Sequence, residues 1–234
     1  MAVPRGDRVR WYFSFRSPYS WLTYRELTTR YEDVAEALDW IPYWEPDDRS
    51  RRMLAEAGGH FPYVAMSREK HLYILQDVRR LARARELSIT WPVDRTPCWE
   101  VAHLAYLVAA AHGKRREFVA SVYRERWERG NDICLRSTIA AVGDELGLDA
   151  ARLANAADDD EIRRQGVDVL LAIGRDGVFG VPFFVRGYDK FWGLDRLPDV
   201  VALVRGKVSR PDNPVEVIDP DAIALDSGHA GGCG

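Results

Sequence analysis

An α/β fold, in which a small mixed sheet is interrupted by a long helical segment, is the fold class that this sequence predicts. Short runs of aromatic and β-branched residues occur within the first 45 residues and again after residue 176, and such runs are typical of strands. The residues between them carry apolar side chains at helical spacing. A chain of 234 residues that is 47% hydrophobic is long enough for one large domain, or for a small domain carrying an insertion.

The first part of the chain has the order strand, helix, strand. Residues 9–15 predict a buried strand that stops before Ser17 and Pro18. A hydroxyl residue directly before proline is typical of a helix start, with Ser17 as the N-cap and Pro18 at the first helical position. The helix is expected to run to about residue 30, and residues 38–43 predict a second strand. Because a helix separates the two strands, we expect them to be parallel.

The middle of the chain, from about residue 47 to residue 147, is predicted to be helical. Apolar side chains recur at spacings of three and four residues and predict helices over residues 68–85, 97–112, 118–127 and 136–146. Gly147 follows the last of these, and we expect it to form the C-terminal cap of that helix.

The last part of the chain returns to strands. An amphipathic helix is predicted over residues 159–175, followed by a strand over 177–185, a turn over 186–188, a strand over 190–193 and a helix over 195–205. The complete order is that of a thioredoxin-like sheet (βαβ–ββα) with a large all-helical insertion. We therefore divide the chain into an N-terminal βαβ part (8–46), a helical insertion (47–155), a C-terminal αββα part (156–206) and a polar tail (207–234).

Composition excludes several classes of protein. A net charge of −3 argues against nucleic acid as a partner, because phosphate binding usually leaves a basic excess. No run approaches the roughly 20 apolar residues that span a bilayer, and the start lacks the apolar region of a signal peptide, so we expect a cytoplasmic protein. Cys98, Cys134 and Cys233 form no C-x-x-C, which excludes a dithiol redox motif. No metal site is expected, since the five histidines include no H-x-x-x-H pair.

Four segments resemble those of two related groups of enzymes. Residues 13–22 (FSFRSPYSWL) resemble the F-x-x-x-S-P-[YF]-S-[YW]-L opening of the 2-hydroxychromene-2-carboxylate isomerases and the kappa-class glutathione transferases, both of the DsbA-like thioredoxin superfamily. Three more segments match in the same order: RGNDI at 129–133, GVFGVP at 177–182 and FWGLDRL at 191–197. The resemblance covers about residues 9–205 and implies a DsbA-like or kappa-transferase-like fold, in agreement with the element order.

The start of the first helix carries the chemistry. Thioredoxin-type oxidoreductases place a cysteine there, where the helix dipole favours a thiolate. This chain has Ser17 and Ser20 in place of C-x-x-C, which excludes disulfide exchange at this site, because a hydroxyl cannot form a mixed disulfide. In the family that this sequence resembles, the thiolate belongs to bound glutathione, and the hydroxyl equivalent to Ser17 donates a hydrogen bond to its sulfur. The alternative is that Ser17 only caps the helix.

The resemblance implies further contacts with the thiol peptide. Pro182 matches a cis-proline, and the backbone of Val181 would hold the cysteinyl part of glutathione as an added strand. Asp195 and Arg196 match positions that bind the γ-glutamyl amine and carboxylate. The alternatives are an ordinary proline at a strand start and an acidic residue that is favourable at a helix start for structural reasons alone.

Two further contacts are less direct. Lys70 aligns with a lysine of the family that contacts the glycyl carboxylate, although a lone lysine on a helix is equally explained by solvation. Related enzymes carry a G-N-x-P-type segment whose asparagine contacts the thiol peptide, and this chain has AGGHFP at residues 57–62 instead. Either His60 replaces the asparagine or the site has diverged.

These observations predict an enzyme whose nucleophile is supplied by a bound thiol. We expect an isomerase that uses glutathione, or another low-molecular-weight thiol, and acts on an aromatic-derived enone by reversible thiolate addition. A kappa-like transferase and a non-redox DsbA-like peptide-binding or chaperone module are the alternatives. The family resemblance also implies a homodimer. Six aromatic residues near these segments would suit a flat substrate if they are not simply core: Tyr12, Tyr19, Trp44, Phe61, Phe179 and Trp192.

Overall fold

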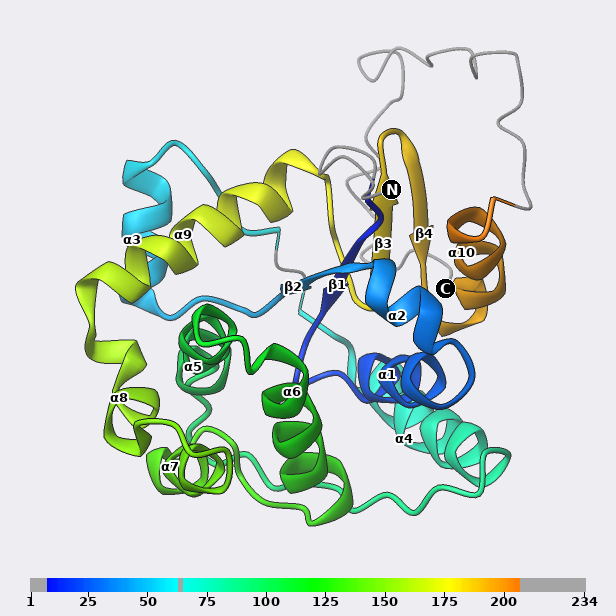
Figure 1. Ribbon diagram of the computed structural model, residues 1–234, viewed down its shortest axis with the longest axis horizontal. Coiled ribbons are helices and arrows are strands. Elements are labelled where there is room, and N and C mark those ends of the chain that lie inside the picture. Colours follow the sequence, from blue (N-terminus) through cyan, green and yellow to red (C-terminus); the bar gives the residue numbers. More distant parts are fainter. Residues whose placement is uncertain (1–7, 63–64, 207–234) are drawn as a thin grey trace.

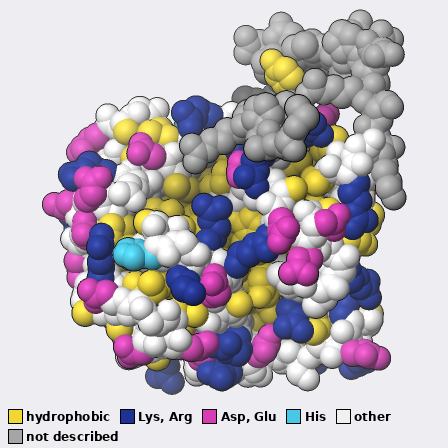
Figure 2. Space-filling view, viewed as in Figure 1, with side chains coloured by type: hydrophobic (Ala, Val, Ile, Leu, Met, Phe, Trp, Pro, Cys, Tyr) yellow, Lys and Arg dark blue, Asp and Glu magenta, His cyan; other side chains and the backbone are white. Residues whose placement is uncertain are grey.

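The computed structural model describes residues 8–62 and 65–206 (Figure 1). The tail predicted for residues 207–234, with Cys233, lies outside the described residues. Within these ranges, no helix combines the length and the apolar character needed to cross a bilayer. Basic and acidic side chains are interspersed over the face seen in Figure 2.

Four strands form one mixed sheet in the order β2–β1–β3–β4, and they span Asp39–Pro42, Arg10–Phe13, Phe183–Arg186 and Asp189–Trp192 in that order. β1 and β2 run parallel, as predicted from the helix between them, whereas β3 is antiparallel to both β1 and β4. The prediction of a strand from residue 177 was wrong in its start. Pro182 has no N–H to donate to the ladder, and β3 begins directly after it.

Helices fill most of the rest of the described chain: α1 Pro18–Arg30, α2 Glu32–Ala37, α3 Asp48–Glu56, α4 Arg68–Arg83, α5 Glu100–Ala111, α6 Arg115–Tyr123, α7 Arg136–Glu145, α8 Ala150–Ala154, α9 Asp160–Arg175 and α10 Leu197–Val204. A π-helical turn, η2 (Arg124–Glu128), extends α6, and short 3-10 turns form at η3 (Ala156–Asp158) and η4 (Leu194–Arg196). The predicted helices are present with ends shifted by a few residues, and α2 was not predicted as a separate helix. Gly147 caps α7 as expected, with a φ of 67° and the Leu148 N–H donating to Gly143 O at 2.9 Å.

The helices pack in two groups (Figure 1). α1, α2, α4, α10 and η4 contact one another on the right of the view, and α3 with α5 to α9 forms a second group on the left. The end of β1 and the start of α1 lie between the groups. Side chains from both helix groups can therefore contact the residues at this junction.

The hydrophobic core is continuous across the predicted boundary between residues 46 and 47. Phe13, the last residue of β1, and Phe15, in the loop that follows it, are fully buried. Their rings contact those of Tyr106 on α5 and Tyr123 on α6, at centroid distances of 5.3 Å for Phe13–Tyr106 and 5.4 Å for Phe15–Tyr123. Truncating one buried aromatic side chain typically costs about 3–5 kcal/mol, so the sheet and the inserted helices stabilise each other.

Candidate active site

The first turn of α1 begins as the sequence predicted. Ser17 is the N-cap, and its Oγ accepts a hydrogen bond from the Ser20 N–H at 3.2 Å, while Pro18 opens the helix. In the described part of the chain, the Tyr19 N–H has no acceptor. The helix tip thus presents one free backbone donor together with the positive end of the helix dipole, which favours an anion.

The loop before β3 meets this helix tip. The Val181–Pro182 peptide bond is cis, as expected. The Ser17 hydroxyl donates to the Val181 carbonyl oxygen at 3.4 Å, although the two residues are 164 positions apart. Pro182 O accepts the Gly193 N–H at 3.0 Å, which also brings the end of β4 to this place. The Val181 N–H makes no hydrogen bond to a described residue and is available to a ligand.

Asp195 and Arg196 lie in η4, which packs against α1, one turn before the helix that they were expected to open. Arg196 Nε is 3.6 Å from Asp195 Oδ2, and both side chains are more than half exposed. A Cβ atom at Gly193, whose φ is 106°, would lie 2.5 Å from Asp195 Oδ1, so only glycine fits there. The structure therefore places this charged pair on the element that packs against α1, with both charges facing solvent.

Lys70 and His60 are not brought to Ser17 by any contact within the described residues. Lys70 is exposed in the first turn of α4, and His60 is exposed in the segment after α3, where its carbonyl oxygen faces Gly174 of α9. Neither side chain makes a hydrogen bond or an ion pair with another described residue. Their roles in thiol binding stay predictions.

Arg16 is a residue that the sequence analysis did not single out. Its side chain is half exposed directly before Ser17, donates to Glu45 Oε2 at 3.2 Å and lies over the Trp99 ring at 5.2 Å. A cation held beside the helix tip adds to the attraction of that tip for an anion. The sequence feature that could have indicated Arg16 is its position inside the matched segment 13–22, directly before Ser17.

The six aromatic residues divide into core and surface. Tyr12 and Trp44 are buried core residues. Tyr19 is half-buried and ties α1 to α4, because its hydroxyl donates to Asp77 Oδ2 at 2.7 Å, and burial together with this carboxylate raises its pKa. Phe179 is 57% exposed two residues before Val181, and its ring packs in a T-shaped arrangement with that of Trp192 at a centroid distance of 4.8 Å. The partly buried Phe61 ring packs on that of Tyr43 at 5.2 Å.

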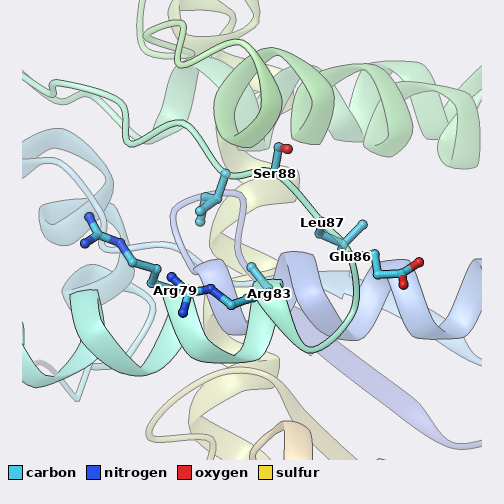
Figure 3. Close-up of a pocket in the computed structure, with 7 residues that line it drawn as sticks. Arg79, Arg83, Glu86, Leu87 and Ser88 are labelled. Atoms are coloured by element: carbon cyan, nitrogen blue, oxygen red, sulfur yellow. The ribbon is translucent and has the colours of Figure 1, made fainter.

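Two other features of the described chain belong elsewhere in the fold. An open surface pocket at the end of α4 is lined by Arg79, Ala82, Arg83, Glu86, Leu87, Ser88 and Ile89, and Figure 3 shows the Glu86 carboxylate turned away from the two arginines. None of the predicted site residues lines it.

Asp47, Cys98 and Glu100 form the second feature, since their possible ligand atoms lie within 4.8 Å of one another. Protein groups already use the oxygens of both carboxylates. Asp47 accepts two hydrogen bonds from Arg163, at 2.9 and 2.8 Å, and Glu100 Oε1 accepts the Asp47 N–H at 2.6 Å. Burial also raises the pKa of Glu100. These contacts account for the cluster as an internal link between α3, α5 and α9.

Comparison with known proteins agrees with the geometry. A family model described as a DSBA-like thioredoxin domain matches residues 8–205. The chain belongs to this family. Among curated relatives, this DsbA-like protein is 27% identical over 194 residues to the 2-hydroxychromene-2-carboxylate isomerase of Sphingobium xenophagum, covering 81% of this chain and 93% of the relative. The isomerase of Pseudomonas putida is 26% identical over 194 residues, covering 81% and 90%.

Solved structures give the same fold. A selenomethionine 2-hydroxychromene-2-carboxylate isomerase superposes with a TM-score of 0.66 at 23% identity, over 85% of this chain and 94% of that one. The cytosolic disulfide reductase DsbM from Pseudomonas aeruginosa, solved with GSH, superposes with a TM-score of 0.58 at 15% identity, over 85% and 98%. The predicted fold class and the distant relation to the isomerases are thus confirmed. The roles of the individual site residues stay predictions.

Proposed function

We propose that this DsbA-like protein is a thiol-dependent isomerase, which binds glutathione or another low-molecular-weight thiol and acts on an aromatic-derived enone. One observation carries the proposal: an alcohol, Ser17 Oγ, stands at the helix tip beside Val181 and Pro182, and Ser20 supplies no second sulfur. A family site built to handle sulfur then needs a sulfur brought by a ligand. The relation to proteins named 2-hydroxychromene-2-carboxylate isomerase supports an isomerisation.

The helix tip can lower the pKa of a bound thiol. In the free protein, the Ser17 proton points to Val181 O, and rotation of the hydroxyl would turn it toward an arriving sulfur. A hydrogen bond to a charged group contributes about 1.5–3 kcal/mol, and a helix N-terminus adds about 0.3–1 kcal/mol. Together these terms lower a thiol pKa from about 8.5 to roughly 5.5–7.5, so that a substantial fraction of the bound thiol is ionised near neutral pH.

The rest of the tripeptide would be held by groups around the tip. The free Val181 N–H can pair with the cysteinyl carbonyl as in an added strand. Asp195 suits the γ-glutamyl ammonium, and Arg196 suits its carboxylate; both face solvent and would exchange water for the ligand. Lys70 and His60 are proposed contacts with the glycyl end.

The proposed reaction balances without an external oxidant. The thiolate forms a C–S bond to the electron-poor carbon of the enone, and the π electrons move onto the carbonyl oxygen. The former double bond is now single and rotates. The enolate then returns its electrons, the C–S bond breaks, and the thiolate is released unchanged. The exposed Phe179 ring beside Val181 would pack against a flat substrate.

Binding and turnover together test the proposal. Calorimetry with glutathione and a panel of other small thiols should show binding of at least one, and turnover of 2-hydroxychromene-2-carboxylate should require that thiol without consuming it. Absence of binding by every thiol would overturn the proposal. A stable thioether with an aryl halide would indicate a transferase instead, and peptide binding that survives Ser17→Ala without any turnover would indicate a peptide-binding module.

The proposed partners and location follow from the same chemistry. We propose a small aromatic substrate, no nucleic acid or membrane partner, and a homodimer in the cytoplasm, where glutathione is available. Sedimentation of the full chain gives the oligomeric state directly, and a monomer at all concentrations would contradict the dimer.

A further inference from the structure

We propose that three buried side chains of the inserted helices, His103, Tyr123 and Trp127, are positioning residues for the loop that carries Ser17. The inference rests on the proposed function, because it concerns the same hydroxyl. It assigns to the helical insertion a role in setting the place of the reactive group.

The loop between β1 and α1 is held by side chains from distant parts of the sequence. The Tyr123 hydroxyl donates to Ser14 O at 3.2 Å, and Trp127 Nε1 donates to Phe15 O at 3.1 Å. The Phe15 N–H donates to His103 Nε2 at 3.2 Å. The three side chains come from α6, η2 and α5, and each is buried. Two consecutive residues of the loop therefore take their fixed positions from the insertion and not from a neighbouring strand.

His103 is itself held in the tautomer that can accept the hydrogen bond from the Phe15 N–H. Its Nδ1 lies 2.7 Å from the Trp99 carbonyl oxygen, which can only accept, so Nδ1 carries the proton and Nε2 is free to accept the Phe15 N–H. Complete burial lowers the pKa of His103 to about 3, which keeps the ring neutral at physiological pH.

Hydrogen bonds within the loop transmit this position to Ser17. The Ser17 N–H donates to Ser14 O at 3.1 Å, the same oxygen that accepts the Tyr123 hydroxyl. The Ser14 N–H donates in turn to Ser20 Oγ in the first turn of α1 at 3.3 Å. A shift of Ser14 O moves the Ser17 hydroxyl relative to Val181, and a misplacement of about 1 Å can cost about a hundredfold in rate.

The chain offers matched controls that make the same kind of hydrogen bond elsewhere. The Tyr106 hydroxyl is buried in the same aromatic core and donates to Trp40 O at 2.8 Å, in β2. Trp40 Nε1 donates to Ala35 O at 2.9 Å. Neither bond touches the loop. Purely structural hydrogen bonds would make Tyr123→Phe equivalent to Tyr106→Phe, and Trp127→Phe equivalent to Trp40→Phe.

The experiment compares these two pairs of variants in the full chain. We measure the thermal midpoint, the pKa of bound glutathione from thiolate absorbance, kcat and KM, and amide hydrogen exchange over residues 14–17. All four variants should lose thermal stability. Only Tyr123→Phe and Trp127→Phe should speed exchange in the loop and raise the pKa of the bound thiol by about 0.5–1 unit. At a pH below that pKa, kcat should then fall about three- to tenfold with KM nearly unchanged.

The outcomes separate the inference from the proposed function. Equal loop exchange and equal kcat in each pair would overturn the positioning role, even if the wild-type protein is a thiol-dependent isomerase. If the wild-type protein binds no thiol, the proposed function fails, and the exchange measurement still decides whether the insertion holds the loop.

Discussion

Replacing Ser17 by alanine removes two interactions at once, and their effects appear in different measurements. The Oγ atom accepts the Ser20 N–H at 3.2 Å, and its proton, which points to Val181 O at 3.4 Å in the free protein, would turn to the sulfur of a bound thiolate. Loss of the N-cap should lower the free energy of unfolding by about 1 kcal/mol. Loss of the donor to a thiolate, worth about 1.5–3 kcal/mol, should raise the pKa of the bound thiol by roughly 1–2 units.

The rise in thiol pKa predicts a particular pH dependence. For a bound thiol with a pKa near 6.5, the thiolate fraction of Ser17→Ala at pH 7, and with it kcat, should fall by roughly three- to twentyfold. At higher pH the thiol ionises without help, so the variant should recover most of its rate. The pH–rate profile is therefore expected to move to higher pH by the same 1–2 units that absorbance titration of the bound thiol reports.

Two further substitutions separate capping from catalysis. Ser17→Thr keeps both the cap and the hydroxyl and should retain activity. Ser17→Asp also caps the helix well, so the stability is kept, but its charge repels a thiolate and should abolish turnover. An active Ser17→Asp protein, or a Ser17→Ala protein with an unshifted pH profile, would show that the hydroxyl has no part in thiol activation.

Other predictions concern stability. The pKa of His103 is lowered to about 3 by burial, so between that value and 6.5 the unfolded chain binds a proton that the fold does not. His103 alone should thus lower the free energy of unfolding by about 1.4 kcal/mol for each pH unit below 6.5, and the loss on acidification should be smaller by this amount in His103→Gln, as urea titrations at pH 5–7 would show. Glu100, whose pKa is raised by burial, opposes this slope equally in both proteins and cancels in the comparison. Gly143→Ala should cost about 1–3 kcal/mol, because its Cβ would lie 2.9 Å from Ala150 Cα, whereas Gly174→Ala, with nothing nearer than 3.9 Å, should stabilise α9 by about 0.5–1 kcal/mol in the same denaturation assay.

Helix starts and ends could be predicted from the sequence where one or two neighbouring residues determine them. The hydroxyl before proline predicted the start of α1 and its cap, and the glycine after α7 predicted the end of that helix. Apolar periodicity predicted the longer helices. By contrast, α2 spans only Glu32–Ala37, which is too short for a periodic pattern to appear.

Contacts between segments far apart in the sequence could not be predicted from local patterns. His103 lies on a strongly apolar helix, and no local pattern shows that its ring accepts the N–H of Phe15, 88 residues earlier. The same limit applies to Lys70 and His60, whose proposed roles depend on where α4 and the segment after α3 lie relative to Ser17. Val181 and Asp195 could be singled out from the sequence because they lie in motifs matched to the family. Such motifs carry information on tertiary contacts that apolar periodicity does not.

The aromatic contacts between β1 and the inserted helices constrain how such a protein can be redesigned. Phe15, directly after β1, packs against Tyr123 of the inserted helix α6. An insertion joined only by flexible linkers could be exchanged between relatives as a cassette. Here a chimera that changes the inserted helices without changing β1 and the loop after it would leave aromatic rings without their packing partners. The helices and this part of the sheet domain must therefore be transplanted together.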